Sequence, residues 1–145
     1  MEKIGKYRKK AREILFRTLY TYDLRGGDIL EILDEHINNV KGQLSQNVID
    51  YAYSIAKGLS DMLDEVDKVI SINLKEWRLE RLGYPERALL RLGTYELLFS
   101  DISDKGRVFI DILDLAGCYL NGEESLKFIN GVLSSIYKNY QNVKA

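Results

Sequence analysis

Apolar residues recur every three or four positions along almost the whole chain, which is the spacing of helices that bury one face. No run of alternating apolar and polar residues is long enough to predict a β-sheet. The pattern predicts six or seven helices, at about residues 7–25, 28–42, 45–70, 76–82, 85–99, 103–116 and 123–140. The sequence therefore predicts an all-α fold, organised as a single compact domain over residues 1–145.

Turn and capping residues mark the ends of these helices. Gly26 and Gly27 follow the first helix, at a place where a residue with positive φ is common. Asp28 and Ser45 suit the caps of the second and third helices, because their side-chain oxygens accept hydrogen bonds from free backbone N–H groups. Pro85, the only proline, suits the first turn of a helix.

The reactive side chains do not form the pattern of an enzyme. The single histidine, His36, lies in an acidic predicted helix and is expected to be solvated. The single cysteine, Cys118, follows apolar residues and is expected to be buried, and alone it forms neither an internal disulfide nor a zinc site. There is no glycine-rich phosphate loop and no catalytic constellation, so we predict no cofactor, no metal and no enzymatic activity.

Without a long apolar stretch or a signal core, we predict no membrane association and a cytoplasmic location.

Charge is distributed unevenly along the chain, although its net value is only −1. Residues 1–25 hold eight basic and three acidic residues, a net of +5, whereas the remaining 120 residues have a net charge of −6. A basic segment on an acidic body is typical of a protein that contacts a phosphate backbone. A solvated charged tail would have the same composition.

The first predicted helix has an apolar face and a basic face, at about 100° per residue. The apolar face is expected to pack in the core and contains Ala11, Ile14, Leu15, Thr18, Leu19 and Tyr22. The other face carries Lys9, Lys10, Arg12, Arg17, Phe16 and Tyr20. Because cations neutralise phosphates and aromatic rings stack on unpaired bases, this face predicts binding of single-stranded RNA. Tyr20 keeps a polar hydroxyl and suits the surface, whereas Phe16 suits either a base contact or the core.

Three segments of the chain resemble the NusB family of transcription antitermination factors. The first is residues 8–13 (RKKARE), followed by Leu19, Tyr20 and Asp23. The second combines residues 77–83 (WRLERLG) with residues 86–97 (ERALLRLGTYEL), and the third is residues 125–133 (SLKFINGVL). One stretch departs from the family, because its Ile-Asn-Glu motif is replaced here by residues 110–112 (IDI).

The resemblance implies an all-helical fold of two three-helix bundles, binding to boxA-type single-stranded RNA, and a heterodimer with NusE, a ribosomal small-subunit protein. By position it implies RNA contacts at Arg8, Lys9, Lys10, Arg12, Tyr20, Lys127 and Phe128, and the basic face adds Arg17. It implies NusE contacts at Glu80 and Glu86, acidic residues that suit a basic protein. The pair would tether nascent RNA to the elongating RNA polymerase complex, with other Nus factors as indirect partners and no bond made or broken.

Several residues inside the predicted helices need a packing explanation. Gly93 and Gly131 each lower helix propensity, and a close approach between helices would explain them. Gly58 allows the long third helix to bend. Arg91 and Glu96 lie within apolar helices, where either a buried ion pair or solvent access along their stems would account for them.

Two other functions fit the same pattern. The chain could be a helical adaptor that uses its basic segment to bind an acidic protein. It also resembles the NusB-like accessory domain of some RNA methyltransferases, but such an enzyme needs a second, cofactor-binding domain, for which 145 residues leave no space.

Overall fold

The computed structural model describes residues 2–40, 42–75, 78–101 and 104–144, and these residues form helices and no strand. The helices are α1 (Ile4–Arg25), α2 (Ile29–Asn39), α3 (Gln46–Asn73), a short 3-10 helix η1 (Leu79–Arg81), α4 (Tyr84–Leu98), α5 (Lys105–Tyr119) and α6 (Gly122–Lys144). The predicted all-α fold is confirmed. The helix predicted over 76–82 is present only as η1, and residues 76 and 77 lie outside the described residues.

The predicted caps of α2 and α3 and the predicted end of α1 are confirmed, whereas α2 ends at Asn39 and not at the predicted residue 42. The Asp28 carboxylate accepts hydrogen bonds from the backbone N–H groups of the first turn of α2, the nearer at 2.8 Å. The Ser45 hydroxyl accepts one from the N–H of Val48 at the start of α3. Gly26 ends α1 with φ +76°, a conformation that favours glycine. Pro85 lies in the first turn of α4.

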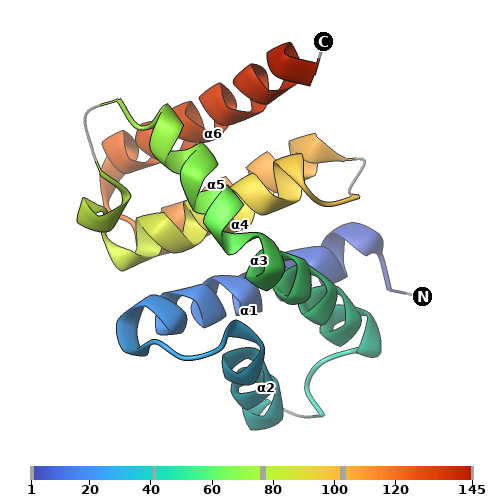
Figure 1. The fold of residues 1–145 in the computed structure, drawn as a ribbon. Coiled ribbons are helices and arrows are strands. Elements are labelled where there is room, and N and C mark those ends of the chain that lie inside the picture. Colours follow the sequence, from blue (N-terminus) through green and yellow to red (C-terminus); the bar gives the residue numbers. More distant parts are fainter. Residues whose placement is uncertain (1, 41, 76–77, 102–103, 145) are drawn as a thin grey trace.

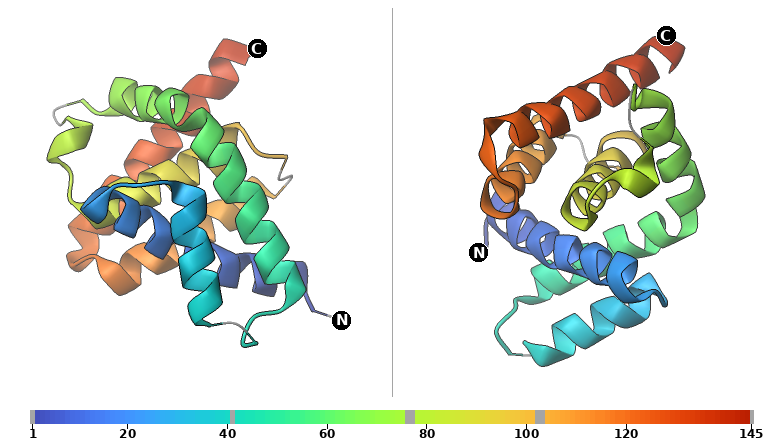
Figure 2. Two further views of the ribbon diagram at one scale, coloured as in Figure 1. Left: turned by 60° about the horizontal axis from the view of Figure 1, so that its bottom comes forward. Right: turned by 90° about the vertical axis from the view of Figure 1, so that its left-hand side faces the viewer.

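Helix α4 is the element that joins two groups of three helices. Helices α1, α2 and α3 pack against one another, as do α4, α5 and α6, and α4 also packs against α1 and α3. Figures 1 and 2 show α4 (yellow-green to yellow) enclosed between these neighbours. As a result every residue from 88 to 98 is buried, including two charged ones.

Close helix contacts explain two of the three glycines that the sequence analysis singled out, which are Gly58, Gly93 and Gly131. A Cβ at Gly93 would lie 3.0 Å from the side chain of Leu133, so the close helix approach predicted for this glycine is confirmed, and the neighbouring helix is α6. At Gly58 a Cβ would overlap the Tyr95 ring, and α3 continues through this position while changing direction along its length (Figure 2, left). The same explanation is wrong for Gly131, because nothing lies within 4 Å of its Cβ position.

Arg91 occupies a buried ion-pair cluster between three helices. Its guanidinium donates two hydrogen bonds to Asp67 of α3, at 2.9 and 3.0 Å, and one to Asp23 of α1 at 2.7 Å. Arg87 also donates to Asp23, at 3.1 Å. The ion-pair explanation of Arg91 is therefore confirmed, and the cluster links α1 and α3 to α4.

Candidate nucleic-acid interface

Four exposed cations form one arc along α1. They are Lys6, Lys9, Lys10 and Arg17. Lys9 pairs with Asp114 of α5 at 3.0 Å, while Lys10 and Arg17 lie 3.7 and 3.9 Å from the carboxylate of Glu13. Exposed pairs of this kind contribute little to stability, so these cations can exchange their carboxylate partners for phosphates at low energetic cost.

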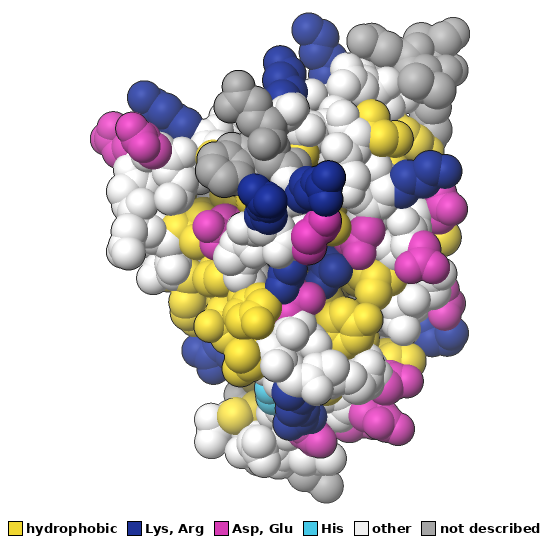
Figure 3. Space-filling model, turned by 60° about the vertical axis from the view of Figure 1, so that its left-hand side comes forward, with side chains coloured by type: hydrophobic (Ala, Val, Ile, Leu, Met, Phe, Trp, Pro, Cys, Tyr) yellow, Lys and Arg dark blue, Asp and Glu magenta, His cyan; other side chains and the backbone are white. Residues whose placement is uncertain are grey.

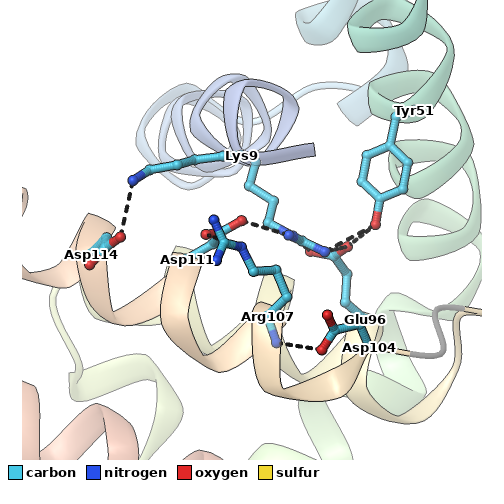
Figure 4. A network of polar contacts seen from close by, with 8 residues as sticks. Lys9, Tyr51, Glu96, Asp104, Arg107, Asp111 and Asp114 are labelled. Carbon is cyan, nitrogen blue, oxygen red and sulfur yellow. Dashed lines mark hydrogen bonds and ion pairs between the residues drawn. The ribbon is translucent and has the colours of Figure 1, made fainter. Parts of the chain in front are cut away.

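The structure corrects the placement of Arg12 on this exposed face. Arg12 is completely buried, and its guanidinium donates two hydrogen bonds to Glu96 of α4, at 2.8 and 3.0 Å, and one to Asp111 of α5 at 2.7 Å. Figure 4 labels Glu96 and Asp111 in this network, together with Tyr51 of α3, whose hydroxyl donates a hydrogen bond to Glu96. Arg12 is buried because of its position around the helix axis. It lies about 60° around α1 from Lys9, on the side away from Lys10 and Arg17. Arg12 therefore links four helices and presents no guanidinium to RNA.

The electrostatics of this cluster favour a permanently charged Arg12. Burial alone would lower the pKa of Arg12, but the hydrogen bonds and charge of Glu96 outweigh it and raise the pKa. Burial, together with the adjacent Glu96 carboxylate, raises the pKa of the Tyr51 hydroxyl. Asp111, in the stretch that departs from the family pattern, thus holds an interior arginine, and Glu96 is the second interior charge whose ion-pair explanation is confirmed.

Arg8 also lies apart from the exposed cations. Its guanidinium carbon is 5.0 Å from the centre of the Tyr51 ring, and the side chain lines a hollow with Ser54, Phe99 and Asp101. On α1 it is about 100° from Lys9, on the same side as Arg12. The structure therefore brings together Lys9, Lys10 and Arg17 but places Arg8 over a different surface.

An aromatic hollow opens beside Arg17. It is lined by Phe16, Tyr20 and Thr21 of α1, Pro85 of α4 and Tyr119 of α5, and His36 of α2 borders it. The ring centres of Phe16 and Tyr119 are 4.6 Å apart, and the Tyr20 and Tyr84 rings meet edge-on at 5.9 Å. Figure 3 shows hydrophobic side chains gathered on one face, with Lys and Arg side chains around them and the histidine at their edge.

The aromatic residues that line this hollow, and Tyr84 beside Tyr20, differ in exposure. Phe16 is 2% exposed and forms the floor, so its core position is the correct one of the two alternatives. Tyr20 is half-buried, while Tyr84 and Tyr119 are 37% and 42% exposed. Tyr84 and Tyr119 were not predicted from the sequence, because they belong to other helices and nothing in their local sequence marks them.

His36 and Cys118 differ from their predicted environments. His36 is half-buried, with Nδ1 3.2 Å from the Thr18 hydroxyl, and burial lowers its pKa. The ring is therefore predominantly neutral at neutral pH. Cys118 is exposed, so its predicted burial is wrong.

A second hollow lies next to the first turn of α4. It is lined by Leu82, Gly83, Glu86, Ser125 and Phe128. The structure thus places Phe128, predicted to contact RNA, next to Glu86, predicted to contact a protein partner. Lys127 is exposed on α6, and Glu80 is exposed in η1. Because Pro85 lines the aromatic hollow and Glu86 the second one, the first turn of α4 lies between the two.

The described parts of the chain hold no group of three or more His, Cys, Asp or Glu side chains placed to bind a metal ion. None of their helices is both long enough and apolar enough to span a bilayer.

Comparison with known proteins identifies the family. The model of the NusB family matches residues 9–138. The chain belongs to the NusB family. It is 66% identical over 140 residues to the transcription antitermination protein NusB of Persephonella marina, covering 97% of this chain and 99% of that one. The NusB protein of Aquifex aeolicus is 43% identical over 93% of this chain and 90% of its own length.

A solved structure of antitermination factors NusB and NusE in complex with double-stranded RNA contains a similar chain. Its TM-score with this fold is 0.85 at 41% identity, and the match covers 93% of this chain and 98% of the other. The expected family and its helical fold are thus confirmed by the sequence and by the structure.

Proposed function

We propose that this protein is a transcription antitermination factor that binds boxA-type single-stranded RNA as a heterodimer with NusE. The observation that carries the proposal is the arc of exposed cations on α1 beside a hollow lined by aromatic rings. Phosphate-binding cations next to rings that accept unstacked bases are what single-stranded RNA requires. The family and the solved complex of a similar chain with NusE and RNA support the choice of partners.

In this proposal the RNA backbone follows Lys9, Lys10 and Arg17, and a base stacks on Tyr20 in the aromatic hollow. Tyr119, which lines the same hollow from α5, is available to the same base. Lys127 and Phe128 extend the surface past the start of α4. Arg12 is left out because it is buried, and Arg8 lies apart from this path because it is over Tyr51 on another side of α1.

NusE binds through the acidic residues Glu80 and Glu86. Opposite charges steer such an encounter and set its register, and a basic partner suits carboxylates at this position. Because Glu86 and Phe128 line one hollow, a protein bound at Glu86 lies beside the RNA surface and extends its positive charge. The two ligands therefore bind cooperatively, and each tightens the other by the same factor.

The mechanism is assembly, with no bond made or broken. The heterodimer holds nascent RNA and connects it, through other Nus factors, to the elongating RNA polymerase in the cytoplasm. For this role the protein needs only binding surfaces for RNA and NusE at the correct positions.

A titration of labelled RNA tests the proposal. A boxA-like single strand, a scrambled single strand and a duplex are each titrated with and without NusE, at two salt concentrations. We expect the boxA-like strand to bind tightest and NusE to increase its affinity. Equal affinity for all three RNAs would contradict the sequence and strand preference, and equal affinity with and without NusE would contradict the cooperative pair.

Charge reversal at Glu86 separates the two binding surfaces. We expect Glu86→Lys to weaken the NusE complex, and through it RNA binding, while RNA binding by the protein alone is unchanged or slightly stronger because a positive charge has been added. Glu65→Lys, an exposed change of the same charge on α3, serves as the control. Loss of RNA binding by the Glu86 variant without NusE would place this residue in the RNA surface instead.

Tyr20 tests the aromatic hollow. If its ring stacks on a base, Tyr20→Ala should lose about 1–3 kcal/mol of RNA affinity, whereas Tyr20→Phe should retain most of it because the ring remains. Thermal unfolding of each variant is measured in parallel. A large loss of stability together with intact RNA binding by the folded protein would assign Tyr20 to the core.

A further inference from the structure

A third hollow opens on the other side of Arg17, between α1, the end of α2 and the loop that follows it. Its walls carry Lys10 and Ile14 from α1, Asn39 from α2, and Gln43 and Leu44 from the loop. Arg17 and His36 line both this hollow and the aromatic one, so the two hollows are neighbours along the same face. We call it the α1–α2 hollow.

The composition of the α1–α2 hollow suits a nucleotide. Its apolar contacts come from Ile14, Val40 and Leu44, and two cations, Lys10 and Arg17, border it. The exposed amides of Asn39 and Gln43 also line it, and neither side chain makes a hydrogen bond with another described residue. An amide side chain supplies both donors and an acceptor, which match the edge of an unpaired base.

We propose that the α1–α2 hollow holds one base of the bound RNA, next to the base in the aromatic hollow, with Arg17 neutralising the backbone between them. The inference rests on the proposed function and adds to it a specificity pocket: Asn39 and Gln43 read the base edge, and Ile14, Val40 and Leu44 contact its face. The neutral ring of His36 separates the two bases without adding charge. A pocket of mixed apolar and amide character discriminates between bases, whereas the lysines and arginines hold any RNA.

The test removes the two amides and asks which position of the RNA is affected. The variants are Asn39→Ala with Gln43→Ala, and the similarly sized pair Asn39→Leu with Gln43→Met. Asn38→Ala, an exposed amide next to Asn39 that does not line the hollow, is the control. Each protein is titrated with the boxA-like single strand and with a series in which one nucleotide at a time is made abasic, and thermal unfolding confirms that each variant is folded.

We expect both double variants to bind the intact RNA about tenfold more weakly, the loss of roughly two net hydrogen bonds. The dependence on salt should be unchanged, because no charge is removed. At one position of the RNA, the abasic strand should bind wild type and double variants equally, since the base that the amides would read is already absent. The control should behave as wild type.

Three outcomes would overturn the inference: wild-type affinity in both double variants, an equal further loss at every abasic position, or full recovery by the leucine and methionine pair. Failure of the proposed function itself gives a different result, because alanine at Lys9, Lys10 and Arg17 would then leave RNA binding intact. Weakened binding in that cation variant with normal binding in the amide variants would reject the pocket alone.

Discussion

Replacing Arg12 by alanine is expected to destabilise the protein by about 3–5 kcal/mol, the cost of leaving a buried charge without its partner. The change removes the only cation that hydrogen-bonds to both Glu96 and Asp111 among the described residues, and these carboxylates are 0% and 1% exposed. Such a loss is a large part of the stability of an ordinary small protein, so the variant should unfold at a clearly lower urea concentration than the wild type. Urea denaturation measures the effect.

Two comparisons make this expectation specific to the buried cluster. Lys9→Ala, at an exposed position of the same helix, should change stability by no more than about 0.5 kcal/mol. Adding Glu96→Gln and Asp111→Asn to Arg12→Ala should recover part of the loss, because the remaining polar groups are then neutral. A loss for Arg12→Ala as small as that for Lys9→Ala would show that the cluster does not hold the helices together.

Removing the three exposed cations Lys9, Lys10 and Arg17 together should weaken RNA binding more than any single change of the interface. Log affinity falls with log salt, and each phosphate of a single strand that the protein no longer neutralises makes this fall less steep by about 0.7, so three such phosphates reduce the steepness by about 2. At low salt we expect the affinity to fall by more than about tenfold, or about 1.4 kcal/mol. Stability should change little because all three side chains are exposed.

A control with the same net charge separates local contacts from overall electrostatics. Alanine at Lys57, Lys68 and Lys138 also removes three exposed cations, but from α3 and α6. Its salt slope should stay close to that of the wild type. Equal slopes for the two triple variants would mean that the cations of α1 attract RNA only through the charge of the whole molecule.

The sequence predicts best those features that depend on neighbouring residues. Asp28 and Ser45 cap their helices as expected, because a cap involves residues only two or three positions apart. Most of the core face of α1 also follows from helical spacing, because Ala11, Ile14, Leu15, Thr18 and Leu19 are buried, whereas Tyr22 is half-buried.

The candidate site was predicted less completely, because its parts come from separate helices. Arg12 looks like its exposed neighbours until Glu96 and Asp111, 84 and 99 positions away, are brought to it. Tyr119 belongs to the candidate site only because its ring contacts Phe16 of another helix. Gly93 and Gly131 have the same local appearance, yet only Gly93 faces a neighbouring helix.

The position of α4 between the two groups of helices also determines how the protein unfolds. Helices α1 and α3 cover part of α4, and α5 and α6 cover the rest. A fragment ending before α4 would expose the apolar side chains of α1 and α3, and a fragment beginning at α4 would expose that helix along one side. Because opening either half exposes the other, we expect the protein to unfold as one cooperative unit, and the backbone amides of α4 should exchange with solvent most slowly.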